Sequence, residues 1–246
     1  MKPPQSLPHP FRRLPRRIEV AEILDDPEGV STQALTRSLG AMTQVNSRLG
    51  GVRSLLRHLR PLTRSLGHRS LSLLDMGVGS GSLPREVSRA LEGEGVKVEW
   101  IGVDRELPVL GVARQDQNGP NRELVCADAL ALPFAANSFD VVISSLTLHH
   151  FADEAARLAL EEAARVARMA VLMSDLERHP LHYLGARVLA RSWWRNDPIT
   201  RHDGPASVLR AFTRAELESL SRSLPFERVQ VHRHLPFRIV FEGIPA

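Results

Sequence analysis

The stretch Leu71-Ser-Leu-Leu-Asp75-Met-Gly77-Val-Gly79-Ser-Gly81-Ser-Leu-Pro84 organises the chain. In it, an apolar run ends in an acid, and three glycines follow at alternate positions. This pattern predicts a strand, a tight backbone turn and then a helix whose first N–H groups have no partner within the helix. Because glycine has no side chain, a ligand can approach the turn closely. The stretch therefore predicts a site for a nucleotide or a nucleoside-like cofactor.

Length and composition indicate one α/β domain with additions, since the chain has 246 residues of which 43% are hydrophobic. No apolar run reaches the roughly 20 residues that span a bilayer, and no apolar signal core follows the basic N-terminus. We therefore expect a cytoplasmic protein without a transmembrane segment. Cys126 is the single cysteine, which excludes an internal disulfide and a Cys-based zinc site, and no metal site is expected.

The charge balance gives little support to a nucleic-acid partner. The isoelectric point of about 10.1 is high, but the formal net charge is only +4. Lys2 and Lys97 are the only lysines, so the high value reflects arginine, whose side chain titrates at very high pH. No nucleic-acid partner is expected.

The pattern along the chain predicts three parts. Residues 1–17 are rich in Pro and Arg and should form a flexible arm. Residues 18–66 read as an N-terminal helical cap, with Ser31 as a helix N-cap. Residues 67–246 should form the main domain, with a helical insertion at about 180–211. Within this insertion, residues 201–204 read as a polar turn, by default a surface loop.

Strand and helix signals alternate in the main domain. Helices are expected at 83–91, 108–117, 154–168, 181–194 and, after a Thr213–Glu216 capping box, 214–223. Such alternation predicts a doubly wound, Rossmann-like α/β fold with a seven-stranded sheet and a terminal antiparallel hairpin. The expected strands are residues 71–76, 96–104, 123–127, 139–145, 170–174, 227–234 and 237–241.

Acids at successive strand ends indicate which cofactor the glycine turn holds. Asp75 precedes the first glycine, where a carboxylate would repel a pyrophosphate but suits an ammonium or sulfonium cation. Asp104 ends the second strand and can accept hydrogen bonds from ribose hydroxyls, and Asp128 can accept one from an adenine amine. The glycine spacing G-x-G-x-G also departs from the dinucleotide pattern. These features favour S-adenosylmethionine over a dinucleotide.

Four segments resemble the motifs of class I S-adenosylmethionine-dependent methyltransferases, in the same order and at similar separations. They cover roughly residues 70–176 and resemble most closely the small-molecule branch that includes the ubiquinone and menaquinone methyltransferases. The segments are Leu-Leu-Asp75-Met-Gly77-Val-Gly79-Ser-Gly81, Gly102-Val103-Asp104, Cys126-Ala-Asp128-Ala-Leu-Ala-Leu-Pro133-Phe, and Ser138-Phe-Asp140-Val-Val-Ile-Ser144-Ser followed by Leu148-His149-His150-Phe151.

The resemblance implies roles for individual residues. The glycine turn would follow the methionine part of the cofactor, Asp104 would hold the ribose, and Asp128 with the backbone of Ala129 would hold the adenine. Arg105 could stack on the adenine or point to solvent. The cofactor-binding residues predicted in this way are Asp75, Gly77, Val78, Gly79, Gly81, Asp104, Arg105, Asp128, Ala129, Ser144 and Ser145.

The acceptor's chemistry rests on fewer signals. His149 or His150 could remove a proton from a phenol, but a mechanism of positioning alone is an alternative, and either histidine could instead brace the loop. His202 is a rival base. The aromatic segment could line the acceptor pocket or could simply pack onto the sheet. Its members are Tyr183, Leu184, Trp193 and Trp194.

The sequence thus predicts a methyltransferase acting on a small molecule. The favoured reaction is O-methylation of a phenol or hydroxyl in a polyketide or quinone, as in secondary metabolism. The alternative is C-methylation of a quinone ring. A non-catalytic protein that binds S-adenosylmethionine remains open, although such a protein would be expected to lose the acids. A nucleic-acid methyltransferase is disfavoured because Ser144-Ser-Leu-Thr147 stands where an Asn-Pro-Pro-Tyr motif would be needed.

Overall fold

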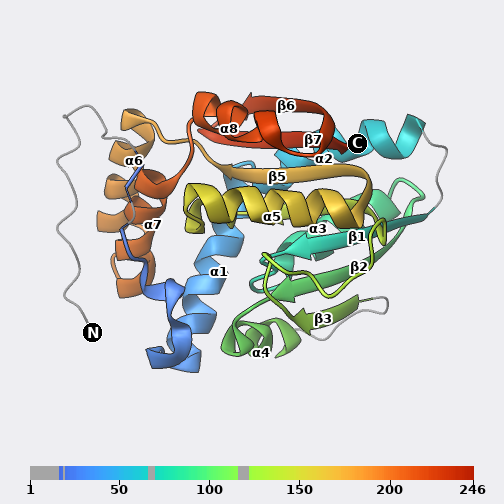
Figure 1. Ribbon diagram of the computed structural model, residues 1–246. Coiled ribbons are helices and arrows are strands. Elements are labelled where there is room, and N and C mark those ends of the chain that lie inside the picture. The colour runs from blue at the N-terminus through green and yellow to red at the C-terminus, as the bar shows by residue number, and fades with distance from the viewer. Residues whose placement is uncertain (1–16, 19, 66–69, 116–121) are drawn as a thin grey trace.

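The computed structural model describes residues 17–18, 20–65, 70–115 and 122–246, so most of the expected N-terminal arm lies outside the described residues. Within these ranges seven strands form one sheet in the order β3-β2-β1-β4-β5-β7-β6 (Figure 1). Strands β1 to β5 pair in parallel, and β7 runs antiparallel to β5 and β6. The strands are β1 Ser70–Met76, β2 Lys97–Asp104, β3 Arg122–Cys126, β4 Phe139–Ser145, β5 Ala167–Leu176, β6 Phe226–His234 and β7 Arg238–Pro245.

The predicted fold class is confirmed, including the terminal antiparallel hairpin. The central strands are largely buried because helices cover both faces of the sheet. One face packs on α5 (Asp153–Val166), and the other packs on α2 (Gly51–Ser65) and α3 (Ser82–Glu92). The expected helix 154–168 ends earlier, at Val166, and β5 begins at the next residue.

The remaining helices place the site. α1 (Thr32–Arg48), α6 (Pro180–Arg191) and α7 (Pro198–Arg210) gather at one end of the sheet (Figure 1). The other helices are α4 (Leu107–Gln115) and α8 (Arg214–Leu220). Two predicted caps are confirmed: Ser31 accepts a hydrogen bond from the Ala34 backbone, and Thr213 with Glu216 forms a capping box. No helix of the described residues is long and apolar enough to cross a membrane.

The expected polar turn at residues 201–204 is wrong, because these residues lie inside α7. Asp197 caps this helix and Pro198 occupies its first turn, a position that favours helix initiation. Gly204 reflects close packing rather than a turn, since a Cβ there would lie 2.6 Å from the Trp194 ring. Buried Asp203 accepts hydrogen bonds from the backbone of Ile23 and Leu24 and so joins α7 to the N-terminal segment.

The ligand crevice of such a sheet lies where the strand order reverses. Here that point is β1, which pairs with β2 on one side and β4 on the other. α1 closes over it, because Thr43 Oγ1 lies 3.0 Å from both Ser80 Oγ and Ser82 Oγ, beside the glycine turn. The carboxyl ends of the strands therefore face the helices α1, α6 and α7.

Gly102 in β2 provides a test of this packing. A Cβ at this position would lie 2.5 Å from Val78 Cγ2, so Gly102→Ala should force the glycine turn to shift and destabilise the protein by about 1–3 kcal/mol. Gly111→Ala is the control, because Gly111 lies inside α4 with open space around it. This substitution should raise the free energy of unfolding by about 0.5–1 kcal/mol. Urea denaturation measures both. Equal effects of the two substitutions would contradict this packing.

Candidate active site

A cavity of about 330 Å³, here called the first cavity, opens at the carboxyl ends of β1, β2 and β4. Its walls come from the strand ends, from α1 and from the segment before α1. The first cavity brings together residues that lie far apart in the sequence. The predicted site residues that line it are Asp75, Gly77, Val78, Gly79, Asp104, Arg105, Asp128, Ala129, Ser145 and His150.

The glycine turn has the tight backbone that its sequence predicts. Gly77 and Gly79 have φ angles of +75° and +53°, which favour glycine. A Cβ on Gly77 would also lie 2.4 Å from Thr147 Oγ1. Gly81 was expected to contact the cofactor, but it does not line the first cavity. With φ +71° it lies just before α3, where it allows the chain to enter the helix.

Asp75 is the most unusual group in the first cavity. Its side chain is buried, and neither carboxylate oxygen has a hydrogen-bond partner in the described part of the chain. Burial, and next the nearby charge of Asp104, raise the pKa of Asp75 well above its ordinary value. A buried carboxylate without a partner is costly, so the site lacks a cation or donor that would pair with it. An ammonium or sulfonium group fits this position.

The other two strand-end acids keep free acceptor capacity. Asp104 accepts hydrogen bonds from Gly79 N at 3.2 Å and from Glu106 N at 3.1 Å, and burial raises its pKa. Asp128 accepts one from Leu130 N at 2.9 Å. Each acid therefore stabilises its own loop by accepting backbone hydrogen bonds, as a capping residue does. Each also lines the first cavity and can accept further hydrogen bonds there.

Two predicted binding residues have partners within the protein. Ser144 is buried outside the first cavity, where its Oγ donates to Met76 O at 2.6 Å and ties β4 to β1. Arg105 lies at the rim, and its Nε pairs with Glu106 at 2.8 Å. Ser145 does line the first cavity, and its Oγ donates to Asn46 Oδ1 at 2.9 Å.

A second cavity, of about 270 Å³, adjoins the first. The two share the lining residues Glu22, Leu24, Met42, Leu146 and His150. The rest of the second cavity is mostly apolar and comes from α1, α6, α7 and the β6–β7 turn. Its apolar members include Val45, Leu49, Leu176, Leu189, Trp194, Val208 and Phe237. The size and apolar lining suit an aromatic small molecule.

The aromatic segment contributes little to the wall of the second cavity, although the sequence allowed it to line an acceptor pocket. Of its members only Trp194 lines the second cavity, because Tyr183 is buried elsewhere in the core and Trp193 is 44% exposed. The flat surface comes instead from Phe237, whose ring stacks on His182 with centroids 5.1 Å apart. His202, the rival base, lines neither the first nor the second cavity and pairs with Asp203.

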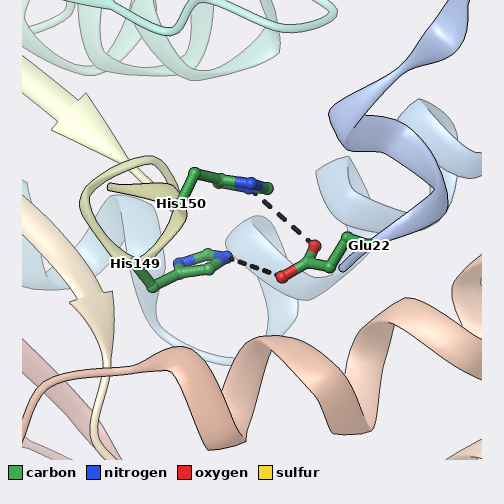
Figure 2. Close-up of side chains that lie close together, drawn as sticks. All are labelled: Glu22, His149 and His150. Atoms are coloured by element: carbon green, nitrogen blue, oxygen red, sulfur yellow. Dashed lines mark ion pairs between the residues drawn. The ribbon is translucent and has the colours of Figure 1, made fainter. Parts of the chain in front are cut away.

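His149 and His150 lie in the turn η3 (Leu148–His150) after β4, each held by a carboxylate. His149 Nδ1 lies 2.7 Å from Asp175, and His150 Nδ1 lies 2.8 Å from Asp25. His149 lines only the second cavity, whereas His150 lines both. Both Nε2 atoms point toward Glu22, as Figure 2 shows.

Several residues of this site were missed by sequence reasoning. Glu22, Asp25 and Arg210 surround the two histidines, although they come from the segment before α1 and from the end of α7. Burial raises the pKa of Glu22 to about 7. None belongs to a motif, so only the three-dimensional structure reveals them. The one sequence signal for Glu22 was that it is an acid within the otherwise apolar stretch 20–24.

Arg238 was also missed. Its guanidinium is buried at the second cavity and forms no ion pair with a carboxylate of the described residues. It donates to Asn46 Oδ1 at 3.0 Å and lies 3.5 Å from Ser145 Oγ. Burial lowers its pKa to about 10, so it stays charged at neutral pH. This donor can hold an oxygen atom of a ligand in an otherwise apolar space.

Residues 73–169 match the family described as "Methyltransferase domain". The chain is 37% identical over 112 residues to the demethylmenaquinone methyltransferase of Roseiflexus sp. (strain RS-1), and the aligned region covers 44% of each of the two chains. It is 32% identical over 148 residues to a ubiquinone biosynthesis O-methyltransferase of Cereibacter sphaeroides (strain ATCC 17029 / ATH 2.4.9), covering 58% of this chain and 57% of the relative. The matches thus span about half of these relatives.

Solved structures show the same fold. Human N-acetylserotonin methyltransferase in complex with S-adenosylmethionine aligns with a TM-score of 0.64 and 15% identity, over 90% of this chain and 60% of that one. Magnesium protoporphyrin IX methyltransferase from Synechocystis PCC 6803, with bound S-adenosylhomocysteine, aligns with a TM-score of 0.60 and 18% identity, over 90% and 97%. The resemblance stated from the sequence motifs is confirmed.

The unpaired Asp75 predicts a pH dependence of stability. Because its folded-state pKa is raised, the unfolded chain ionises first, so stability falls as the pH rises from about 4 toward the folded pKa. Asp75→Asn removes this loss, about 1.4 kcal/mol for each unit by which the pKa is raised. The free energy of unfolding of the Asp75→Asn variant should therefore rise relative to that of the parent as the pH rises to 7.

Asp140→Asn is the matched control, because ion pairing with Arg168 and hydrogen bonds with Ser72 hold the pKa of Asp140 low despite its partial burial. A lowered pKa contributes stability above the unfolded pKa, so this variant should be less stable than the parent at pH 7. Urea denaturation at several pH values measures all three proteins. If the free energy of unfolding changed with pH in the same way for Asp75→Asn and the parent, the raised pKa of Asp75 would be refuted.

Proposed function

We propose that this chain, whose residues 73–169 match a methyltransferase domain, transfers a methyl group from S-adenosylmethionine to an apolar small molecule. The observation that carries the proposal is the junction of the two cavities. A polar cavity with the glycine turn and three strand-end acids opens into an apolar one through Glu22 and His150. The first cavity would hold the methyl donor and the second the acceptor.

The first cavity fits the cofactor's chemistry. Asp75 offers an unpaired carboxylate to its cationic methionine part, and Asp104 offers acceptor capacity to the ribose hydroxyls. Asp128 and Ala129 lie where the adenine would bind. The crystallised relatives named above bind S-adenosylmethionine or its product, which supports the same ligand here.

The bound cofactor supplies a methyl group that its sulfonium already activates. The protein therefore has to align the acceptor, exclude water and direct the acceptor's proton. The apolar walls of the second cavity exclude water, and Arg238 can fix an acceptor oxygen. The lone pairs of His149 and His150 face the place where the two cavities meet, where the proton of a hydroxyl acceptor would leave.

The acceptor we favour is a phenol or hydroxyl of a quinone or polyketide, methylated on oxygen. The histidines support O-methylation, since an oxygen acceptor must lose a proton. The alternative is C-methylation of a quinone ring, which the similarity to demethylmenaquinone methyltransferases supports. Both acceptors are flat and apolar with an oxygen that Arg238 could bind.

The cofactor assignment predicts a binding result. Calorimetry should detect S-adenosylmethionine binding to the parent, and Asp104→Asn should weaken it by about 10- to 100-fold, the effect of losing a hydrogen bond to a charged group. Glu99→Gln on the same strand is the control, because Glu99 is exposed and pairs with Lys97. Unchanged affinity in Asp104→Asn would rule out the ribose role.

The acceptor assignment predicts which compounds are methylated. Incubation with S-adenosylmethionine labelled in its methyl group should label apolar phenols or hydroquinones in a panel that also contains polar phenols, amines and RNA. Mass spectrometry of the product separates O-methylation from C-methylation. Label found only in RNA, or only in polar amines, would contradict an apolar acceptor site.

A further inference from the structure

The three side chains in Figure 2 come close to one another without forming hydrogen bonds. His149 Nε2 lies 3.7 Å from Glu22 Oε1, and His150 Nε2 lies 3.9 Å from Glu22 Oε2. These separations are too long for hydrogen bonds. The three ligand atoms all lie within 4.8 Å of one another. Glu22 Oε1 is buried and has no hydrogen-bond partner in the described residues.

The tautomers of the histidines follow from their other partners. Asp175 and Asp25 can only accept when ionised, so the Nδ1 of each imidazole must donate to its carboxylate. With Nδ1 as the donor, the Nε2 of a neutral imidazole carries a lone pair, and both Nε2 atoms face the Glu22 carboxylate.

This arrangement is typical of metal ligands. Metal-bound histidines commonly donate their second ring N–H to a carboxylate, which fixes the tautomer and the ring orientation. Two ligand atoms bonded at about 2.1 Å to one tetrahedral ion lie roughly 3.4 Å apart. The two separations from Glu22 exceed this value by only a few tenths of an ångström, so small side-chain shifts would bring the groups onto one ion.

The local charge also favours a cation. Glu22, Asp25 and Asp175 are three carboxylates around the cluster, with Asp203 nearby. Opposing them is Arg210, whose Nη1 lies 3.7 Å from Glu22 Oε1 but is paired with Asp25. Arg17 lies on the other side of His149, where it donates to His149 O at 3.2 Å and is paired with Asp153. Arg238 acts on Asp175 from the second cavity. The four carboxylates still outnumber these three guanidinium groups.

We propose that Glu22, His149 and His150 bind a divalent transition-metal cation at the junction of the two cavities, where it holds the oxygen of the methyl acceptor. Two nitrogen ligands and one oxygen ligand suit Zn²⁺, Mn²⁺, Fe²⁺ or Co²⁺ better than Mg²⁺ or Ca²⁺. Three protein ligands leave a position open, as in catalytic metal sites. The inference rests on the proposed function for its role, since Glu22 and His150 line both cavities.

The cation would select acceptors that bind through oxygen. With the cation bound, the two histidines would serve as ligands and not as bases. A phenol or enol would then lose its proton to bulk water as it enters the cavity and binds the cation, which lowers its pKa as it does that of metal-bound water. The oxygen then forms the new bond to the methyl carbon, and the carbon–sulfur bond breaks with its electron pair left on sulfur. Asp175 and Asp25 are positioning residues in this scheme, because they act through the imidazoles.

A second cluster in the described residues offers a contrast and a control. His58 Nδ1 forms a hydrogen bond of 2.9 Å with Glu242 Oε2, so a histidine already occupies that oxygen. His232 Nε2 lies 3.1 Å from the same oxygen without the geometry of a hydrogen bond. His232 is partly exposed on β6, well away from either cavity. Substituting it tests whether an ion prefers the surface cluster.

Titration of the metal-stripped protein with Co²⁺, followed by visible absorption and calorimetry, tests the proposal. The parent should bind one Co²⁺ per chain with the spectrum of mixed nitrogen and oxygen ligation. Glu22→Gln and His150→Asn should each weaken this binding by at least about 10-fold, because each removes a ligand. His232→Asn should retain it.

Three results would overturn the metal site: no Co²⁺ binding to the parent, unchanged binding in both Glu22→Gln and His150→Asn, or loss of binding in His232→Asn. Calorimetry of the stripped parent with S-adenosylmethionine separates this failure from that of the proposed function. If the cofactor binds but Co²⁺ does not, only the metal site is wrong. If the cofactor does not bind, the proposed function itself fails.

Discussion

The guanidinium of Arg210 joins the three segments on which the site depends. It donates to Val20 O at 3.2 Å, to the Asp25 carboxylate at 2.5 Å and to His150 O at 2.7 Å. These bonds connect the end of α7 to the segment before α1 and to the turn after β4. A buried charge is tolerated only when its donors are satisfied, so the three segments must come together around it. Both cavities are enclosed by segments that Arg210 joins.

Two buried ionisable groups at this site form no ion pair within the part of the chain that the structure describes, and their positions match the chemistry proposed. Asp75 is an unpaired carboxylate in the polar cavity, and Arg238 is a buried guanidinium in the apolar one. Each costs stability when no ligand is bound. Such costs are common at functional sites, where a ligand supplies the missing partner. A cationic methyl donor and an oxygen-bearing acceptor would complement the two charges.

The sequence predicted the part of the site that is local in the chain. The glycine turn and the acids Asp75, Asp104 and Asp128 could be found because each follows a strand, and parallel strands end at one edge of a sheet. The strand pattern also predicted the sheet and its terminal hairpin. Gly81, which was also predicted to contact the cofactor, does not line the first cavity but lies just before α3, where it allows the chain to enter the helix.

The rest of the site depends on contacts between distant parts of the chain. Asp25 and Arg210 are separated by 185 residues, and neither lies in a motif. Residues 201–204 were expected to form a polar turn but lie inside α7, where Gly204 makes room for Trp194. The pairing of Glu22 with His149 and His150 likewise arises only in the folded chain.

A crystal structure with S-adenosylhomocysteine would show whether the first cavity holds the methyl donor and the second cavity the acceptor. We expect the amino group of the ligand beside Asp75, its ribose on Asp104 and its adenine at Asp128 and Ala129. The sulfur should then face the junction with the second cavity, toward His150. Density for the ligand in another place, or with its sulfur turned away from the second cavity, would refute these roles of the two cavities.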